Sequence, residues 1–193
     1  MKIIVTGFEP FGGAETNASW EAVKDLRDVR TVLLPVSFRR AAGMIRSLAA
    51  EEPDLLICVG EAGNRKAISL ERIAVNWMDA RIPDNDGWQP VDEKICPDRP
   101  AAWFPTLPVR EMAEAVQAAG IPAELSWSAG TYVCNTVFYS LMDEIDRLGL
   151  KTKGGFIHVP AGWMEPGQLR GALEAAIRQA AGKSGSLEKN TGR

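Results

Sequence analysis

The sequence has a single histidine, two tyrosines and no long run of apolar residues. Its three cysteines, Cys58, Cys96 and Cys134, are an odd number in unrelated contexts, so a framework of disulfide bonds is not expected. The stretch Met1–Gly7 has too few consecutive apolar residues for a signal peptide or a membrane-spanning helix. These absences predict a soluble, cytoplasmic protein whose thiols are free for chemistry.

An excess of positive charge is also lacking. The 22 Lys and Arg residues are outnumbered by 25 Asp and Glu, for a formal net charge of −3, and the basic residues form no stripe. The charge pattern therefore indicates no nucleic-acid partner. A chain of 193 residues is long enough for one domain with a sizeable core. We expect a single domain over 1–181 and a polar tail over 182–193.

Short apolar runs alternate along the chain with segments of helical periodicity. The runs predict strands over 3–6, 31–36, 54–59, 71–76, 123–128 and 155–159. The periodic segments predict helices near 22–26 and 41–48, and over 109–119, 135–148 and 168–181. This alternation is typical of an α/β fold, a three-layer α/β/α sandwich with a mostly parallel or mixed central sheet.

Loops that follow strands are where such sheets bind ligands. Four loops are therefore the candidates for a site, and they cover 7–13, 60–65, 128–135 and 158–162. The Pro-rich stretch from Pro83 to Pro108 is instead expected to be a long surface excursion.

His158 is the residue on which any imidazole chemistry must rely, because the chain has no other histidine. It lies near the end of a predicted strand, just before Val159 and Pro160. Position alone leaves a second interpretation open, in which the ring is half-buried and bonded to a backbone carbonyl.

The three cysteines differ in their surroundings. Cys58 lies inside an apolar strand and is interpreted as part of the core, and Cys96 lies in a loop without an evident partner. Cys134 precedes a predicted helix, where the helix dipole lowers a thiol pKa and backbone N–H groups can hold an oxyanion. A packed cysteine that merely begins a helix fits the same pattern.

Glu71 and the segment Gly7–Gly13 carry weaker signals. Period-two alternation places Glu71 on one strand face with Ile73 and Val75, so its carboxylate needs a buried partner, either an arginine or an imidazole. The glycine-rich segment lacks the spacing of nucleotide-binding loops. Its Phe8 and Phe11 suggest an apolar pocket wall, and an ordinary tight turn is the alternative.

Six motifs together resemble the pyroglutamyl peptidase I family, also called pyrrolidone-carboxylate peptidases. They occur in order over nearly the whole chain, at Thr6–Gly13, Ile57–Gly60, Glu71–Asn76, Ala80–Asn85, Ala129–Asn135 and Gly154–Pro160. The resemblance implies a cysteine omega-peptidase that removes an N-terminal pyroglutamyl residue from peptides through a thioester acyl-enzyme. It also implies a homotetramer that needs no cofactor and no metal.

Site residues follow from the same resemblance. The family's Glu-Cys-His triad falls on Glu71, Cys134 and His158, and an arginine beside the active centre falls on Arg81. Residues of the lactam pocket fall on Phe8, Phe11, Ile82, Tyr132 and Val133. Two rival functions stay open, a Cys-His amidase that acts on another cyclic amide and a lactam-binding domain that has lost turnover.

The chain departs from the family pattern at three places. Glu61 stands where Gln is usual, Ala18 stands in Asn17-Ala18-Ser19 where Pro is usual, and the segment after Pro160 is short and unlike the family's continuation. We expect the backbone at Glu61, rather than its side chain, to meet the substrate. A buried carboxylate there would need a partner such as Arg65 or Arg81.

Overall fold

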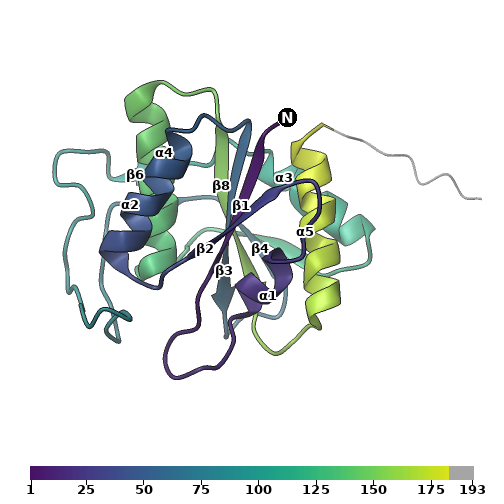
Figure 1. The fold of residues 1–193 in the computed structure, drawn as a ribbon, viewed down its shortest axis with the longest axis horizontal. Coiled ribbons are helices and arrows are strands. Elements are labelled where there is room, and N and C mark those ends of the chain that lie inside the picture. Colours follow the sequence, from purple (N-terminus) through teal and green to yellow (C-terminus); the bar gives the residue numbers. More distant parts are fainter. Residues whose placement is uncertain (183–193) are drawn as a thin grey trace, which may run out of the picture.

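A computed structural model describes residues 1–182 of the chain (Figure 1). Its six-stranded central sheet has the order β2-β1-β3-β8-β4-β7. These strands are β1 (Ile3–Phe8), β2 (Arg30–Leu34), β3 (Leu55–Ala62), β4 (Ile68–Glu71), β7 (Ala123–Ser126) and β8 (Lys153–Pro160). The predicted polar tail lies outside the described residues except for Gly182.

The sheet is mixed. Strands β2, β1, β3 and β8 pair in parallel, whereas β4 pairs antiparallel with β8 and parallel with β7. Within residues 1–182, four helices lie between strands and a fifth follows β8: α1 (Ala18–Val23), α2 (Phe38–Ala49), α3 (Val109–Ala118), α4 (Val133–Leu148) and α5 (Pro166–Ala180). The α/β prediction with a mostly parallel or mixed sheet is confirmed.

Figure 1 shows the three layers, with α2 and α4 on one side of the sheet and α1, α3 and α5 on the other. Alternation along the strands divides the core in the same way. In β3, Leu55, Ile57 and Val59 pack with α1, α3 and α5, whereas Leu56 and Cys58 pack with α2 and α4. Side chains at successive positions of a central strand thus face opposite helix layers.

The prediction of a strand over 71–76 is wrong. Strand β4 ends at Glu71, and the chain re-forms a strand only at β5 (Ala74–Val75). That strand pairs with β6 (Ala102–Trp103) in a separate two-stranded sheet. Glu71 therefore shares its face of the sheet with Ser69 rather than with Ile73 and Val75.

The segment from Pro83 to Pro108 is more structured than an exposed excursion. It contains β6, and the amide of Asn76 bonds to the backbone of Cys96 in both directions. Arg99 forms ion pairs with Asp143 and Asp146 of α4 at 2.5 and 2.7 Å. These contacts fasten the segment to the outside of α4.

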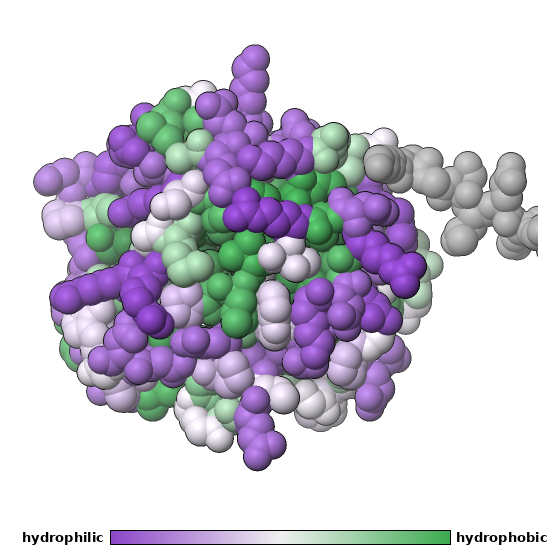
Figure 2. Space-filling model, in the orientation of Figure 1, coloured by the Kyte–Doolittle hydropathy of each residue, from purple (hydrophilic) through white to green (hydrophobic). Residues whose placement is uncertain are grey.

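Figure 2 shows the molecule from the side of β2, one of the two edge strands of the sheet. Apolar side chains gather in the middle of this view, between borders of polar ones. Leu33 on β2 contributes to the exposed apolar surface, with 42% of its area accessible. Within residues 1–182, no helix has the length and apolar character needed to cross a membrane.

Candidate active site

A cavity of about 280 Å³ opens at the carboxyl ends of β1, β3 and β8. Each of the four loops that the sequence singled out contributes to its wall, so their predicted convergence is confirmed. The lining residues are Phe8, Phe11, Asn17, Val36, Glu61, Asn64, Arg81, Ala129, Tyr132, Val133, Cys134 and His158.

His158 and Glu71 are in direct contact beneath this cavity. Nδ1 of His158 lies 2.8 Å from Oε1 of Glu71. The imidazole is 4% exposed and the carboxylate is fully buried. Ser69 of β4 is the register partner of His158 on β8, so Glu71, two residues along and on the same face, reaches the ring. A carboxylate in this place accepts a hydrogen bond from Nδ1–H. In the neutral ring, Nε2 then carries no proton.

Cys134 is the second residue of α4, which begins at Val133, two residues before the predicted start. The N-cap Tyr132 makes no side-chain hydrogen bond to the first turn. The thiol packs against the backbone of Gly60, where an added Cβ would lie 2.8 Å from Sγ. Because Gly60 is the register partner of His158, the thiol and the imidazole lie over neighbouring positions of the sheet, and both line the cavity.

The side of the sheet on which these groups lie follows from alternation. Phe156 and His158 of β8, and Glu71 of β4, face the layer that contains α4 and its Cys134. Ring centroids of Phe156 and His158 are 4.8 Å apart, and Phe8 and Phe138 flank the same phenylalanine. The imidazole therefore has an aromatic support on one side and a carboxylate on another.

The ionisation of the Cys134 thiol differs from the sequence prediction. Burial, reinforced by the charge of Glu71, raises the pKa of Cys134 to about 12. The expectation that the helix N-terminus lowers it is wrong, because loss of water around a thiolate outweighs the helix dipole. Burial also lowers the pKa of His158, against the opposing effect of Glu71. At neutral pH, the thiol and the imidazole are both uncharged.

Glu71 has two partners rather than the one that the sequence predicts. Besides His158, Nη1 of Arg65 lies 2.7 Å from the same carboxylate oxygen, Oε1. The sequence left an arginine and an imidazole as alternatives, and the buried carboxylate contacts both.

The other two cysteines occupy the surroundings predicted for them, with one addition. Cys58 is fully buried in β3, and burial raises its pKa to about 12. Cys96 has a neighbour that the sequence did not suggest, since Nη2 of Arg46 lies 3.2 Å from its Sγ. Cys134 alone of the three lines the cavity.

Four of the five pocket residues expected from the resemblance line the cavity: Phe8, Phe11, Tyr132 and Val133. Arg81 lines it too, from the loop after β5. Ile82 is 45% exposed and is not among the lining residues. Tyr132 is held in place by its hydroxyl, which donates to the carbonyl of Pro83 at 3.0 Å.

Among the lining residues missed in the sequence are Asn17, Val36, Asn64 and Ala129. Asn17 could have been found, because Asn before a short helical run is an N-cap signal. Its Oδ1 accepts from the backbone N–H and the hydroxyl of Ser19, and its Nδ2 donates to the carbonyl of Glu9. The other three carry no pattern of their own.

Comparison with known proteins fits this geometry. The family model for "Pyroglutamyl peptidase" matches residues 1–169. The chain belongs to the pyroglutamyl peptidase family. A pyrrolidone-carboxylate peptidase from Bacillus subtilis is 47% identical over 167 residues, which cover 82% of this chain and 78% of that protein. One from Thermococcus onnurineus is 48% identical over 83% of this chain and 84% of its own length.

Solved structures of the pyroglutamyl peptidase family share the fold. The crystal structure of pyroglutamyl peptidase I from Bacillus amyloliquefaciens superposes with a TM-score of 0.90 at 41% identity. The match covers 94% of this chain and 97% of that one. The family model ends within α5, so it includes the unusual segment after Pro160, where Trp163 is 57% exposed and Lys66 lies over its ring.

Two of the chain's departures from the pyroglutamyl peptidase pattern meet in space. Oε2 of Glu61 accepts the backbone N–H of Ala18 at 2.6 Å, an N–H that a proline at that position would lack. Glu61 has the odd parity of Val59, so its carboxylate reaches toward α1, while the residue still lines the cavity that holds Cys134. The Glu61 carboxylate thus has a partner, which is neither of the two arginines, Arg65 and Arg81, that the sequence suggested.

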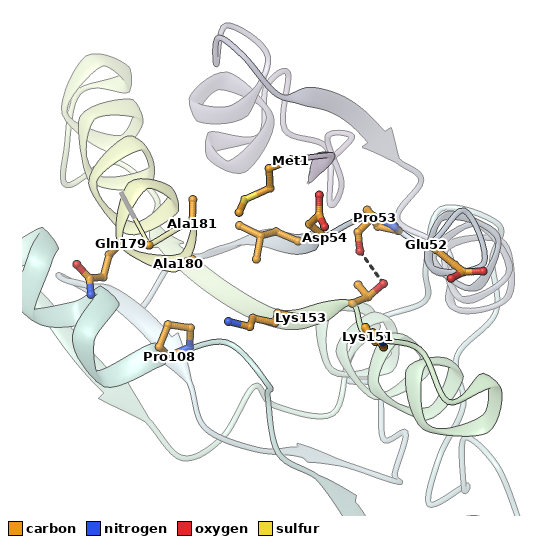
Figure 3. Close-up of a pocket in the computed structure, with 13 residues that line it drawn as sticks. Met1, Glu52, Pro53, Asp54, Pro108, Lys151, Lys153, Gln179, Ala180 and Ala181 are labelled. Carbon is orange, nitrogen blue, oxygen red and sulfur yellow. Dashed lines mark hydrogen bonds between the residues drawn. The ribbon is translucent and has the colours of Figure 1, made fainter. Parts of the chain in front are cut away.

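Another cavity, of about 530 Å³, lies at the opposite, amino end of the strands (Figure 3). Met1, Asp54 and Lys153 are among its lining residues. None of the candidate catalytic residues lines it, so the larger volume does not mark the candidate active site.

Proposed function

We propose that this chain is a cysteine omega-peptidase that hydrolyses the bond after an N-terminal pyroglutamyl residue. The observation that carries the proposal is the buried contact of His158 with Glu71 in a cavity that also holds Cys134. Membership of the pyroglutamyl peptidase family supports the same reaction. In this proposal, Glu71, Cys134 and His158 form a catalytic triad.

The first half of the reaction starts from neutral groups. Nε2 of His158 takes the proton of the Cys134 thiol as Sγ bonds to the pyroglutamyl carbonyl carbon. Glu71 accepts the hydrogen bond of Nδ1–H, and its negative charge stabilises the imidazolium that results. A thiol with a raised pKa needs such a base, because too little thiolate is present at neutral pH to attack unaided.

The tetrahedral intermediate needs donors for its oxyanion. Backbone N–H groups in the first turn of α4 are available for this role, since Tyr132 provides no side-chain cap. Arg81 supplies a positive charge to the cavity wall. As the intermediate collapses, the C–N bond breaks and the imidazolium gives its proton to the leaving amine, which leaves a thioester on Cys134.

Water completes the cycle. His158 takes a proton from a water molecule whose oxygen attacks the thioester carbonyl, and the C–S bond breaks. Pyroglutamate leaves, and the thiol of Cys134 recovers its proton from the imidazolium. All the groups that move protons belong to the chain, so the reaction requires no cofactor.

The cavity suits a small, flat and neutral acyl group. Phe8, Phe11, Tyr132 and Val133 give it apolar walls, and its volume of about 280 Å³ is limited. A pyroglutamyl lactam has an uncharged nitrogen, whereas an N-terminal prolyl residue carries an ammonium that would lose its water among these apolar walls, and the wall carboxylate Glu61 already accepts the Ala18 N–H. The proposed substrates are therefore peptides with N-terminal pyroglutamate.

The decisive test compares a pyroglutamyl chromogenic amide with its prolyl counterpart. We expect release of the chromophore from the pyroglutamyl amide alone. Binding without release would favour a lapsed lactam-binding domain, and release from a different cyclic acyl group would favour an amidase of other specificity.

We also propose a cytoplasmic homotetramer in which residues 1–181 form the peptidase domain. Family resemblance supports the tetramer, and the apolar surface around the edge strand β2 offers area for self-association (Figure 2). Three free cysteines suit a reducing compartment. Light scattering on the whole chain, and on a chain ending at residue 181, tests the subunit count and the domain boundary.

A further inference from the structure

Arg65 lies in the loop between β3 and β4 and is only 17% exposed at its side chain. Its Nη1 is 2.7 Å from Oε1 of Glu71. Nη1 makes no directed hydrogen bond among the described residues, so its contact with Oε1 is an ion pair. Charge, more than a directed hydrogen bond, holds the pair together.

A cation is needed at this place whenever His158 is neutral. The carboxylate of Glu71 is fully buried, and a buried charge without a counter-charge is strongly unfavourable. Because burial lowers the pKa of His158, the imidazole supplies no charge at neutral pH. A guanidinium stays protonated throughout this range. Arg65 is thus the permanent counter-ion of Glu71.

The second arm of Arg65 reaches the segment that carries the nucleophile. Nη2 donates to the carbonyl of Ser128 at 2.8 Å. Ser128 lies in the loop between β7 and α4, the helix that carries Cys134. One side chain therefore joins the carboxylate on β4 to the loop before the thiol.

We infer that Arg65 is a positioning residue for the proposed hydrolysis, which supplies the counter-charge of the Glu71 carboxylate and fastens the loop before Cys134. This inference rests on the proposed function. Arg65 is not among the residues that line the cavity, so its effect passes through Glu71 and through the Ser128 carbonyl.

The charge of Arg65 affects the pKa values of its neighbours, which a purely structural contact with the loop would not do. The ionisable groups around the thiol and the imidazole are Glu71 on β4, Cys58 and Glu61 on β3, Arg81 on the cavity wall, and Arg65. Of these, Arg65 lowers the pKa of both His158 and Cys134. Its removal should move both values upward.

The test uses the fact that His158 is the only histidine in the chain. With a histidine-free purification tag, the imidazole resonances in an NMR titration belong to this residue alone. In Arg65→Gln, we expect the titration midpoint to rise by about one pH unit, the size of effect that a nearby charge produces. Lys66→Gln is the matched control, because it removes one positive charge from the neighbouring exposed residue, whose contact is the Trp163 ring.

Activity provides the second measurement. Arg65→Gln should lose at least about tenfold in kcat/KM near neutral pH, with the acid limb of the profile displaced upward. Arg65→Lys should keep the wild-type midpoint while losing part of the rate, because an ammonium replaces the charge but not both arms of the fork. Lys66→Gln should match the wild type.

Two outcomes would overturn the inference. One is an unchanged imidazole midpoint in folded Arg65→Gln, and the other is a uniform loss of rate in which the limbs do not move. A wild-type chain that fails to hydrolyse pyroglutamyl amides would instead refute the proposed function, and the NMR titration would still decide the role of Arg65.

Discussion

The two ends of the central sheet each carry a cavity, and they differ in how their polar groups are used. At the amino end, a volume of about 530 Å³ is bordered by exposed Glu52, Asp54, Lys151 and Lys153 (Figure 3). At the carboxyl end, about 280 Å³ is bordered by His158, which is buried together with its partner Glu71. Ionisable groups hidden from water mark a place for chemistry more clearly than volume does.

Polar groups at the amino end hold strand starts together. Oδ2 of Asp54 accepts the backbone N–H of Lys2 at 2.6 Å, and the hydroxyl of Thr152 donates to the carbonyl of Pro53 at 2.7 Å. These bonds join the beginnings of β1, β3 and β8. They align the three strands at their amino ends. The carboxyl ends of the same strands, which border the candidate active site, are thereby held in register.

The strongest test of this difference removes one side chain from the cavity at each end of the sheet. Cys134→Ala should abolish hydrolysis of a pyroglutamyl amide, because no other thiol lines the described cavity. Lys153→Ala, at the amino end, should leave the rate unchanged. Cys96→Ala controls for general loss of a thiol. Measurable turnover by Cys134→Ala would end the assignment of the nucleophile.

A crowding experiment tests the close approach of thiol and sheet. In Gly60→Ala, the added methyl group would lie 2.8 Å from Sγ of Cys134 and 2.7 Å from Cζ of Phe156, so the thiol and the ring under the imidazole must both move. We expect kcat to fall by at least about a hundredfold, because small displacements of reacting groups are costly. Gly63→Ala is the matched control, since a Cβ there meets open space. Equal activity of the two variants would contradict the proposed geometry.

The pH dependence of turnover and of alkylation follows from an uncharged His158 and an uncharged Cys134 in the resting protein. The base must be unprotonated, and burial lowers the pKa of His158, so kcat/KM should fall with decreasing pH only below about 6.5. Because the pKa of Cys134 is raised to about 12, alkylation by iodoacetamide should keep increasing above pH 9. An acid limb above 6.5, or alkylation that levels off near pH 8, would indicate a preformed thiolate and imidazolium.

The smallest expected effects concern the contact of Glu61 with Ala18. Ala18→Pro removes the N–H that the carboxylate accepts, and we expect a loss of about 1.5–3 kcal/mol in the free energy of unfolding. Asn17 already has the extended conformation that precedes a proline, so the backbone itself is compatible. Chemical denaturation measures the loss.

Glu61→Gln tests the same contact from the other side. The amide oxygen can still accept from Ala18, so the single variant should change kcat/KM by less than about tenfold. In the double variant, Ala18→Pro with Glu61→Gln, no charge is left without its donor, and most of the lost stability should return. A hundredfold change in kcat/KM in Glu61→Gln would show that the carboxylate acts on the acyl group.

Local sequence was sufficient to predict the features that depend on neighbouring residues. Apolar runs marked the central strands because both faces of a covered sheet exclude water. The loops after those strands were correctly expected to converge, since parallel strands end at one edge. Helix α4 was recognised with its start two residues late, as the capping residue Tyr132 makes no side-chain bond that the sequence could signal.

Features that depend on contacts distant in sequence were not predictable. The break in the strand after Glu71 arises from pairing of β5 with β6, about 28 residues further along. The pairing of Arg65 with Glu71, and of Glu61 with Ala18, requires the register of β3 beside its neighbours. The raised pKa of Cys134 reflects burial by residues from several elements, which a helix start alone does not disclose.

That raised pKa also bears on chemical damage. Peroxides oxidise the thiolate form of cysteine much faster than the thiol, so cysteine enzymes that store a thiolate are readily inactivated. In the proposed reaction, Cys134 keeps its proton until His158 takes it as the sulfur attacks the substrate carbonyl. The resting protein should consequently survive oxidative stress that silences peptidases with an ionised cysteine, and its vulnerable period is confined to turnover.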